Sequence, residues 1–563
     1  SDLLYWNIKN EPLTDKLWFY TAWRGVFMSS VKTGKGTNRS SDSMLLPHII
    51  DVYVFLILCC FPLFVVNQYY ELLKVKYYFY IGSVIFLLTA ALIAGTIGQS
   101  SLKTYFASFK WKDFIKTFST IDTALLVFLL IAGISTIRSD YVYESFWGNE
   151  GRFSGLFLLS LYGAAYFCVT RLGNFKRWYL DAFLAANLLV CIFGITDYFQ
   201  LDLLHFKVGM AENEKFIFTS TIGNINTYTA LVGMVTAVSA VLFAAEGRWK
   251  KKCLYFVSLI ISIFALVMGI SDNAYLSLAA LFGFLPLYLF QNKKGVKAYL
   301  LIITSFFSVI QCIDWINTGL GTSVPEIDSA FQIISQSDGL LFLILLLWIL
   351  CAFVCGPDFV NAHKKNMSAS MQTHIFSKNE YKPTGCRGLQ RTWMALLVLC
   401  ILGVGYALVD VNFQGNAERY GALGSYLLFN DDWGTHRGYI WRNAMECFNQ
   451  FPLRKKIIGF GPDTFGIVLL NKTKGNIYGQ TFDNAHNEYL HYLVTVGFAG
   501  LIAYLAFLIS FAVRVIRRAN KNQYVTAAFF AVLCYSAQAF VNLNLPIATP
   551  IMWMLLMLGE LGI

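Results

Sequence analysis

The chain has 563 residues, of which 56% are hydrophobic and 14% are charged, and its net charge is +11. Soluble domains carry roughly 25% charged residues, so this composition excludes a soluble enzyme. Apolar runs of about 20 residues, each long enough to span a bilayer, recur from end to end and predict an all-α polytopic membrane protein. The positive charge lies in short loops between these runs, where it indicates membrane topology and not nucleic-acid binding.

The first 47 residues precede the apolar runs and are both basic and aromatic. Trp18, Trp23 and Phe27, interleaved with Lys16 and Arg24, favour a cytoplasmic helix lying on the inner leaflet of the membrane. A partly disordered tail is the alternative. The segment lacks the apolar core of a secretory signal, so we expect no cleaved signal peptide.

The lengths of the apolar runs predict about 14 transmembrane helices. The first eleven fall within residues 48–410 and the last three within residues 488–563. They are expected near 48–67, 76–98, 119–137, 155–171, 178–197, 224–245, 253–270, 275–290, 298–318, 338–356, 392–410, 488–513, 524–542 and 546–562.

The loops between these spans alternate in charge. Lysine and arginine collect in every second loop, which the positive-inside rule places in the cytoplasm. Both termini and the polar loop 357–391 are then cytoplasmic, and residues 411–487 form one large, partly helical external loop with a catalytic role. Lys74 and Lys76 do not fit this scheme, because they fall on the predicted external side.

Four segments on the predicted external side carry an unusual number of polar residues. They are 147–155, 221–227, 435–442 together with 457–465, and 483–491. Polar groups at the mouth of membrane helices are costly, so they usually mark a functional site.

Residues 435–451 predict a helix capped by Thr435 and ended by Pro452. At about 100° per residue, Arg437 falls on the apolar face of this helix and Arg442 on the polar face. A cation on a buried face needs an anionic partner. Arg437 is therefore predicted to bind an anion, whereas Arg442 is an ordinary surface charge that supports the site.

His486 is the candidate general base. We expect it in the first turn of the span near 488–513, with Asp483 or Asn484 as the helix cap. The positive end of the helix dipole disfavours imidazolium, and a neutral imidazole can accept a proton. The alternative is a histidine that only bonds a loop carbonyl. Glu488 points to a different side of the helix and is the less favoured base.

Two glycine-containing segments predict places where the backbone can approach a ligand closely. Gly459 and Gly461 lie in an expected tight turn. Gly223 and Asn224 lie at a predicted helix N-terminus, which favours anions.

Together these residues predict an external pocket at the membrane interface. Arg152 and Arg437 suit a diphosphate, because arginine stays charged and binds bidentately. Asp483, Asn487, Glu488 and Gly461 are expected to support this site. The external acids in these motifs are Glu150, Asp463, Asp483 and Glu488. They are scattered and form no pair suited to Mg²⁺, so we expect neither a metal nor a cofactor.

The order and sidedness of the motifs resemble the superfamily of bacterial O-antigen ligases and Wzy polymerases. The motifs that carry the resemblance are 148–155, 221–226, 437–441, 452–465, 483–489 and 497–500. Each motif is short, and together they span most of the chain from the third predicted helix to the thirteenth.

The resemblance implies a GT-C-like, inverting glycosyltransferase of the bacterial plasma membrane, with its active site on the external face. Its donor would be an undecaprenyl-diphosphate-linked glycan, and its acceptor a hydroxyl of a glycan, lipid or protein. By the family pattern, Arg152 and Arg437 hold the donor diphosphate and His486 activates the acceptor. Asp272 departs from the pattern, because many relatives carry arginine there, and this puts one phosphate contact in doubt.

The sequence does not distinguish a ligase from a polymerase. A lipid-linked oligosaccharide flippase or transporter and a SEDS-type cell-wall transglycosylase are the alternatives. A transporter is expected to carry charged residues deep in its spans and internal repeats, and the sequence shows neither clearly. The expected partners are the lipid-linked donor, the acceptor and membrane lipids.

Overall fold

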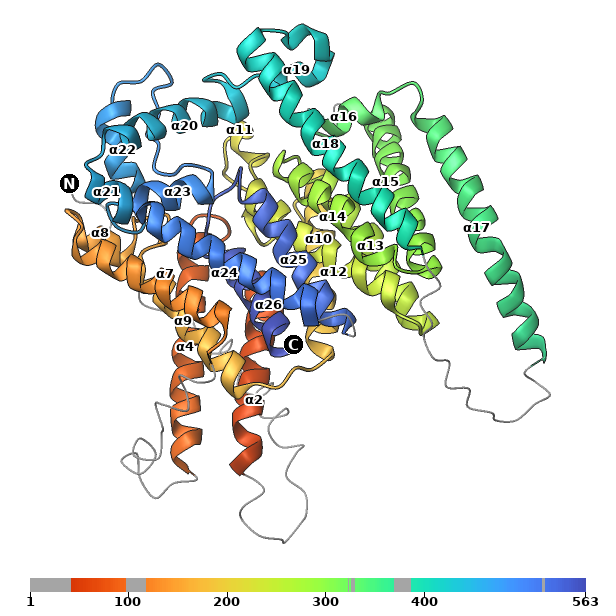
Figure 1. Ribbon diagram of the computed structural model, residues 1–563, viewed down its shortest axis with the longest axis horizontal. Coiled ribbons are helices and arrows are strands. Elements are labelled where there is room, and N and C mark those ends of the chain that lie inside the picture. Colours follow the sequence, from red (N-terminus) through yellow and green to blue (C-terminus); the bar gives the residue numbers. More distant parts are fainter. Residues whose placement is uncertain (1–41, 98–117, 322–323, 326–329, 369–385, 519–521) are drawn as a thin grey trace. The chain divides into compact units, whose positions relative to one another are not determined.

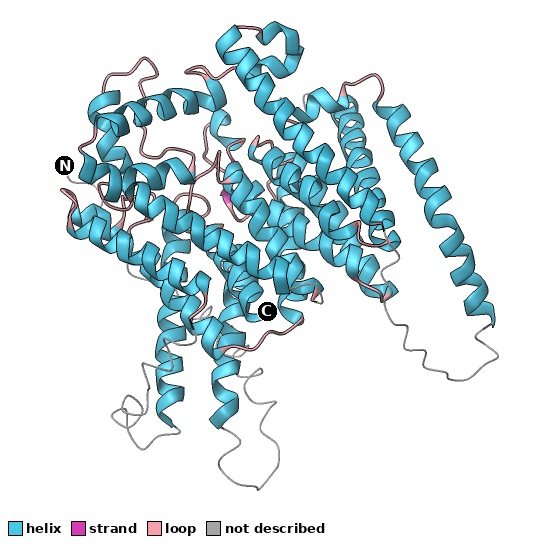
Figure 2. Ribbon diagram, viewed as in Figure 1, coloured by secondary structure: helices cyan, strands magenta, loops and turns pink. Residues whose placement is uncertain are grey.

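The computed structural model describes residues 42–97, 118–321, 324–325, 330–368, 386–518 and 522–563 (Figure 1). Within these ranges the regular secondary structure is helical apart from one short antiparallel pair, β1 (Phe218–Thr219) and β2 (Gly223–Asn224), and loops and turns connect the helices (Figure 2). Residues Leu46–Ile563 make one unit. Most of the predicted N-terminal segment 1–47, and the centre of the predicted cytoplasmic loop 357–391, lie outside the described residues.

The helices of the first half are α2 (Asp42–Phe55), η1 (Leu56–Cys60), α3 (Phe61–Leu63), α4 (Leu72–Ile97), α7 (Thr120–Ile137), α8 (Val142–Trp147), α9 (Leu156–Leu172), α10 (Trp178–Tyr198), α11 (Glu212–Lys215), α12 (Ile225–Ala245), α13 (Trp249–Val267) and α14 (Asn273–Leu289). The helices of the second half are α15 (Lys293–Leu320), α16 (Ala330–Ser335), α17 (Leu340–Ser368), α18 (Arg387–Gln414), η4 (Ala417–Leu423), α19 (Gly424–Leu427), α20 (Trp433–Gln450), α21 (Leu453–Ile458), α22 (Phe465–Thr473), α23 (Glu488–Thr495), α24 (Gly497–Arg518), α25 (Gln523–Gln538) and α26 (Thr549–Leu561).

Each predicted span contains a helix, and eight helical stretches of the described chain are long and apolar enough to cross a membrane. They are Leu45–Leu63, Leu72–Thr96, Thr120–Ile137, Trp178–Tyr198, Ile225–Ala245, Lys293–Leu320, Arg387–Gln414 and Gly497–Arg518. The all-α, membrane-embedded class fits the structure. The number of 14 crossings and the cytoplasmic placement of both termini stay predictions.

The prediction of a single helix over 488–513 is wrong, because this segment forms two helices, α23 and α24. The break is at Gly497, where φ is +78°, and a Cβ added there would meet the Ile457 carbonyl oxygen at 2.3 Å. Only a glycine fits this turn without strain. The long apolar helix therefore begins at Gly497, and α23 is a separate short helix that precedes it.

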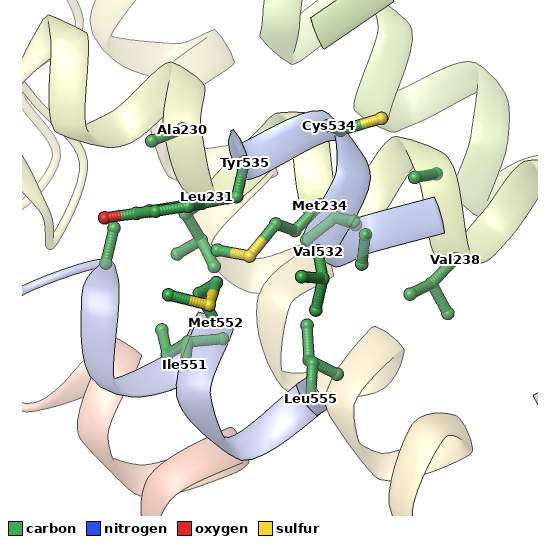
Figure 3. Close-up of a cluster of buried hydrophobic side chains, with 14 of the residues drawn as sticks. Ala230, Leu231, Met234, Val238, Val532, Cys534, Tyr535, Ile551, Met552 and Leu555 are labelled. Atoms are coloured by element: carbon green, nitrogen blue, oxygen red, sulfur yellow. The ribbon is translucent and has the colours of Figure 1, made fainter. Parts of the chain in front are cut away.

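Helix α12 is the most buried helix of the described core and packs against α10, α13, α14 and α25. Small residues permit these close approaches, as is common between membrane helices. The Ser239 and Ser258 hydroxyls bond at 2.8 Å between α12 and α13, and a Cβ on Gly233 would meet Ser277 of α14 at 2.8 Å. Figure 3 shows side chains of α12, α25 and α26 meeting in this core: Leu231, Met234, Val532, Tyr535, Met552 and Leu555.

Lys76, one of the two lysines that did not fit the predicted topology, is fully buried in α4. Its ammonium donates to the carbonyl oxygens of Phe61 at 2.9 Å, Pro62 at 3.1 Å and Phe64 at 3.1 Å. These carbonyls end α3, where a cation is favoured. Lys76 therefore caps helix α3 inside the protein and does not count as a loop charge in the prediction of membrane topology.

The predicted large loop 411–487 is partly helical, as expected. Helix α18 extends four residues into it, to Gln414, and η4 and α19 to α22 follow. Helices α20, α22 and α23 contact one another, and they lie together at the upper left of Figure 1. These helices and the loop between α22 and α23 carry six of the predicted site residues: Arg437, Arg442, Asp483, His486, Asn487 and Glu488. The placement of this part of the chain on the external side of the membrane stays a prediction.

Candidate functional site

The start of α20 differs from the prediction. The helix begins at Trp433 and not at the predicted cap Thr435, and Gly434, Thr435 and His436 all have φ near +60°. Left-handed backbone is strained for Thr435 and His436, so tertiary contacts must hold it. The His436 ring lies 3.9 Å from the ring of Tyr478, whose hydroxyl donates to Asp432 at 2.8 Å. The predicted end of the helix before Pro452 is confirmed.

The predicted faces of α20 are confirmed. Arg437 is buried, with 9% of its surface exposed, together with Ile440 and Ala444. The side chain of Arg442 is 52% exposed and pairs with Asp431 at 2.7 Å. The two arginines therefore face opposite environments, although only one turn and a half of helix separates them.

Arg437 is held by its own turn and keeps unused hydrogen-bonding capacity. Its Nη1 donates to the Gly434 carbonyl oxygen at 3.0 Å, and its buried Nε has no hydrogen-bond partner among the described residues. Burial lowers the pKa of Arg437, and the carboxylate of Asp272 opposes this shift. The carboxylate of Asp272 thus acts directly on the predicted phosphate ligand. A buried guanidinium with an unpartnered N–H suits an anion.

Arg152 forms a two-point ion pair with Asp483. The Arg152 Nε lies 2.9 Å from Oδ2 of Asp483, and Nη2 lies 2.8 Å from Oδ1. The contact brings the 147–155 segment against the 483–491 segment, as the prediction of a common pocket required. It also means that Arg152 already has an anionic partner, which any phosphate must share.

Asp463 has a role that the sequence did not reveal. Its buried carboxylate Oδ2 accepts hydrogen bonds from the backbone N–H groups of Asn149 at 2.7 Å and Ser154 at 3.0 Å. It thereby holds the turn that carries Arg152. Burial raises the pKa of Asp463 to about 6, against the lowering effect of these bonds. The available signal was an aspartate directly after Gly-Pro, a position typical of a side chain that bonds backbone N–H groups.

His486 does not lie in a helix, so its predicted place in the first turn of a span is wrong. Its φ is +46°, and its backbone N–H donates to Oδ1 of Asn484 at 2.9 Å. The helix cap is Asn487, whose Oδ1 accepts from the N–H of Leu490 at 3.0 Å. Asn487 therefore supports the site by ending the loop that presents His486.

The imidazole of His486 is part-buried and neutral. Burial lowers its pKa to about 3, the charges of Arg437 and Arg152 add to this effect, and Asp483 opposes it. Its Nδ1 is buried without a hydrogen-bond partner among the described residues. The four predicted residues Arg152, Arg437, Asp483 and His486 thus share one electrostatic environment. The lowered pKa agrees with the predicted neutral state, but burial and the two cations cause the shift, not a helix dipole.

Gly223 and Asn224 do lie at a helix N-terminus. Asn224 caps α12 by accepting from the N–H of Asn226 at 2.9 Å. Oδ1 of Asn226 accepts from the Ser271 hydroxyl at 2.7 Å, which places this helix end beside the residue that precedes Asp272. Among the described contacts, none joins Gly223 or Asn224 directly to Arg437 or His486, so their part in the site stays a prediction.

The Gly459–Gly461 turn packs against the protein. A Cβ on Gly459 would meet the Thr495 carbonyl oxygen at 2.1 Å, and one on Gly461 would meet Ser145 Oγ at 2.2 Å. The backbone N–H of Gly461 donates to Thr495 at 2.8 Å. The glycines permit close contact with α8 and α23, and through α23 they support the loop that carries His486.

His491 of α23 was not singled out from the sequence. Its buried ring stacks on Phe465 of α22 with 5.6 Å between ring centres. Burial and the charge of Arg152 lower the pKa of His491 to about 4. A second neutral histidine therefore lies in the electrostatic field of Arg152. Its place in the sequence, three residues after the start of α23, gave no indication of a functional role.

Among the described residues, no three or more histidine, cysteine, aspartate or glutamate side chains are grouped as metal ligands. No protein-family model and no curated protein matches this chain. The candidate site is therefore defined by its own geometry: a buried guanidinium, a second arginine paired with a carboxylate, and a neutral imidazole.

Proposed function

We propose that this protein is a membrane glycosyltransferase of the kind found among O-antigen ligases and Wzy polymerases. It would transfer a glycan from an undecaprenyl-diphosphate donor to an acceptor hydroxyl on the external face of a bacterial plasma membrane. The observation that carries the proposal is that Arg437 is buried with an unpartnered Nε and that its charge helps to lower the pKa of the His486 imidazole.

The two arginines suit the diphosphate of the donor. A buried cation is stabilised when an anion binds it, because the anion replaces the solvation that the cation has lost. Arg437 offers its unpartnered Nε, and Arg152 has further N–H donors beyond the two that engage Asp483. Charge-assisted bonds to phosphate are stronger than neutral ones. Arg437 would therefore provide the main contact and Arg152 a shared one.

Donor binding would make His486 a better base. In the free protein the two guanidinium charges hold the pKa of His486 low. A diphosphate at these arginines cancels their field, which raises the pKa of the imidazole towards its ordinary value. A general base is most effective when its pKa lies near the working pH. His486 would thus become competent only when the donor is in place.

The reaction would be a single displacement. The imidazole of His486 takes the proton of the acceptor hydroxyl, and the acceptor oxygen forms a bond to the anomeric carbon of the donor glycan. The bond from that carbon to the diphosphate oxygen breaks, and the undecaprenyl diphosphate leaves with the electron pair. Attack from the opposite side inverts the anomeric configuration.

The test is incubation of the purified protein in lipid nanodiscs with a polyprenyl-diphosphate glycan and separate glycan and lipid acceptors. We expect release of polyprenyl diphosphate together with a new glycosidic bond, and the acceptor that is consumed distinguishes a polymerase from a ligase. Donor that stays intact but crosses the membrane of proteoliposomes would favour a flippase and overturn the proposal. Arg437→Ala is the matched inactive control.

A further inference from the structure

Glu488, the first residue of α23, is a buried acid that the proposed reaction does not use. Only 1% of its surface is exposed. Its Oε1 accepts from the Tyr504 hydroxyl of α24 at 2.7 Å, and Asn544 Nδ2 lies 3.4 Å from the same oxygen. Its Oε2 is buried and has no hydrogen-bond partner among the described residues.

The groups that face Glu488 from each neighbouring helix are neutral. They are Tyr492 of α23, Tyr504 of α24, Tyr535 of α25, Tyr162 of α9 and Asn544 of the connection between α25 and α26. Among the described residues, no lysine or arginine pairs with this carboxyl. Burial raises the pKa of Glu488 to about 7, although the hydrogen bonds from Tyr504 and Asn544 lower it. An ionised carboxylate without a cation in such a site is costly.

The start of α23 is tied to the end of α25. The backbone N–H of Glu488 donates to the Ala539 carbonyl oxygen at 2.9 Å, and the Tyr489 hydroxyl donates to Ser536 at 2.5 Å. Tyr492 and Asn544 bond at 3.0 Å in the same cluster. Because His486 and the cap Asn487 directly precede Glu488, these contacts determine where the imidazole lies.

We propose that Glu488 is a positioning residue that works as a neutral carboxylic acid. The protonated carboxyl still accepts the hydrogen bond of Tyr504 at Oε1, and it anchors the start of α23 among the tyrosines without an unpaired charge. Ionisation would place a charge in this cluster and displace the loop that carries His486. The expected effect on turnover rests on the proposed function, whereas the protonation state of Glu488 does not.

The protonation state is tested by infrared spectroscopy of the whole protein in nanodiscs. At about pH 6, where ordinary glutamates are ionised, we expect the carbonyl stretch of a protonated carboxylic acid. Glu488→Gln should lose the component of this band that belongs to Glu488, and Asp463→Asn should keep it; Asp463→Asn is the matched control because Asp463, with a pKa of about 6, contributes a second component. An identical spectrum in Glu488→Gln and the wild type would overturn the proposal.

The positioning role is tested by the pair Glu488→Gln and Glu488→Ala. Glutamine has the shape of the neutral acid, so Glu488→Gln should retain turnover near the wild-type level and lack the decline above about pH 7 that we expect of the wild type. Glu488→Ala should lower kcat about tenfold to a hundredfold with donor binding retained, as expected for a misplaced base. Equal losses in both folded variants would show that an ionised carboxylate is required and would overturn the proposal.

A wild-type protein without transferase activity would overturn the proposed function alone, because the infrared result on the protonation state of Glu488 does not depend on transferase activity.

Discussion

Arg152 and Asp483 are 331 residues apart in the chain, yet their side chains form two parallel hydrogen bonds of 2.8 and 2.9 Å. This pair joins the turn after α8 to the loop before α23. It also places a cation and an anion within range of His486, where the cation lowers the pKa of the imidazole and the anion opposes that shift. Burial and the charge of Arg437 are the larger causes of the lowered pKa of His486, and this long-range contact adds two opposing contributions to it.

Arg437 and Arg442 should differ sharply in their contribution to transfer. Loss of a group that stabilises developing charge typically lowers kcat by about 10²- to 10³-fold, and we expect this for Arg437→Ala. Arg442 is half exposed and pairs with Asp431, so Arg442→Ala should lower activity only severalfold. Arg437→Lys should also lose activity, because a point charge cannot reproduce a planar fork. The measurement is kcat with melting curves as the folding control, and equal losses in two folded alanine variants would contradict the opposite-face arrangement.

His486→Ala should remove turnover and spare donor binding. A general base contributes typically 10²- to 10⁴-fold, and the arginines would still hold the diphosphate. Turnover and the Kd of a non-hydrolysable lipid-diphosphate analogue should be measured on the same preparation. If the variant no longer binds the analogue, His486 is a binding residue and the base must be found elsewhere.

The neutral state of His486 also predicts how stability depends on pH. Its pKa is about 3 in the folded protein, whereas a histidine in the unfolded chain titrates at about 6.5. Between these values the unfolded state binds more protons, so the contribution of His486 to stability is fully present above about pH 6.5 and is lost as the pH falls towards 3. His486→Gln should weaken this acid sensitivity in melting curves recorded across the range. Parallel curves for variant and wild type would count against the buried, neutral imidazole.

Asp463 should be a stabilising residue and not a catalytic one. Asp463→Gly leaves two buried backbone N–H groups without their acceptor, at about 1–3 kcal/mol for each unsatisfied group, while glycine tolerates the φ of +59° at this position. Asp463→Asn retains an acceptor oxygen and should lower the melting temperature less. A glycine variant as stable as the wild type would mean that the two hydrogen bonds do not hold the Arg152 turn.

Transfer should need no divalent metal. In the proposed site, Arg437 and Arg152 supply the positive charge that a metal ion provides to the diphosphate in other transferases. Transfer by dialysed protein should therefore be the same in EDTA and in Mg²⁺ or Mn²⁺. Activity that appears only after a metal is added would show that the arginines do not suffice and that carboxylates such as Asp272 and Asp483 take part.

The sequence by itself determined the class of the protein and part of the site. Each apolar run that was long enough to span a bilayer contains a helix, because helix formation in apolar segments depends on local composition, although the run 488–513 is divided into two helices. The burial of Arg437 and the exposure of Arg442 also followed from the sequence, because the period of a helix assigns residues to faces without reference to the rest of the chain.

Only the tertiary structure decided the contacts that tune the site. The ion pair of Arg152 with Asp483, the support of the 149–154 turn by Asp463, and the cap formed by Lys76 join segments whose proximity depends on how the helices pack. The break at Gly497 likewise depends on a close approach to the backbone of Ile457. The left-handed turn before Arg437 depends on the contact of His436 with the ring of Tyr478. A local pattern carries no information on such partners, so the sequence predicted His486 inside a helix, whereas packing placed it in a loop under the field of two arginines.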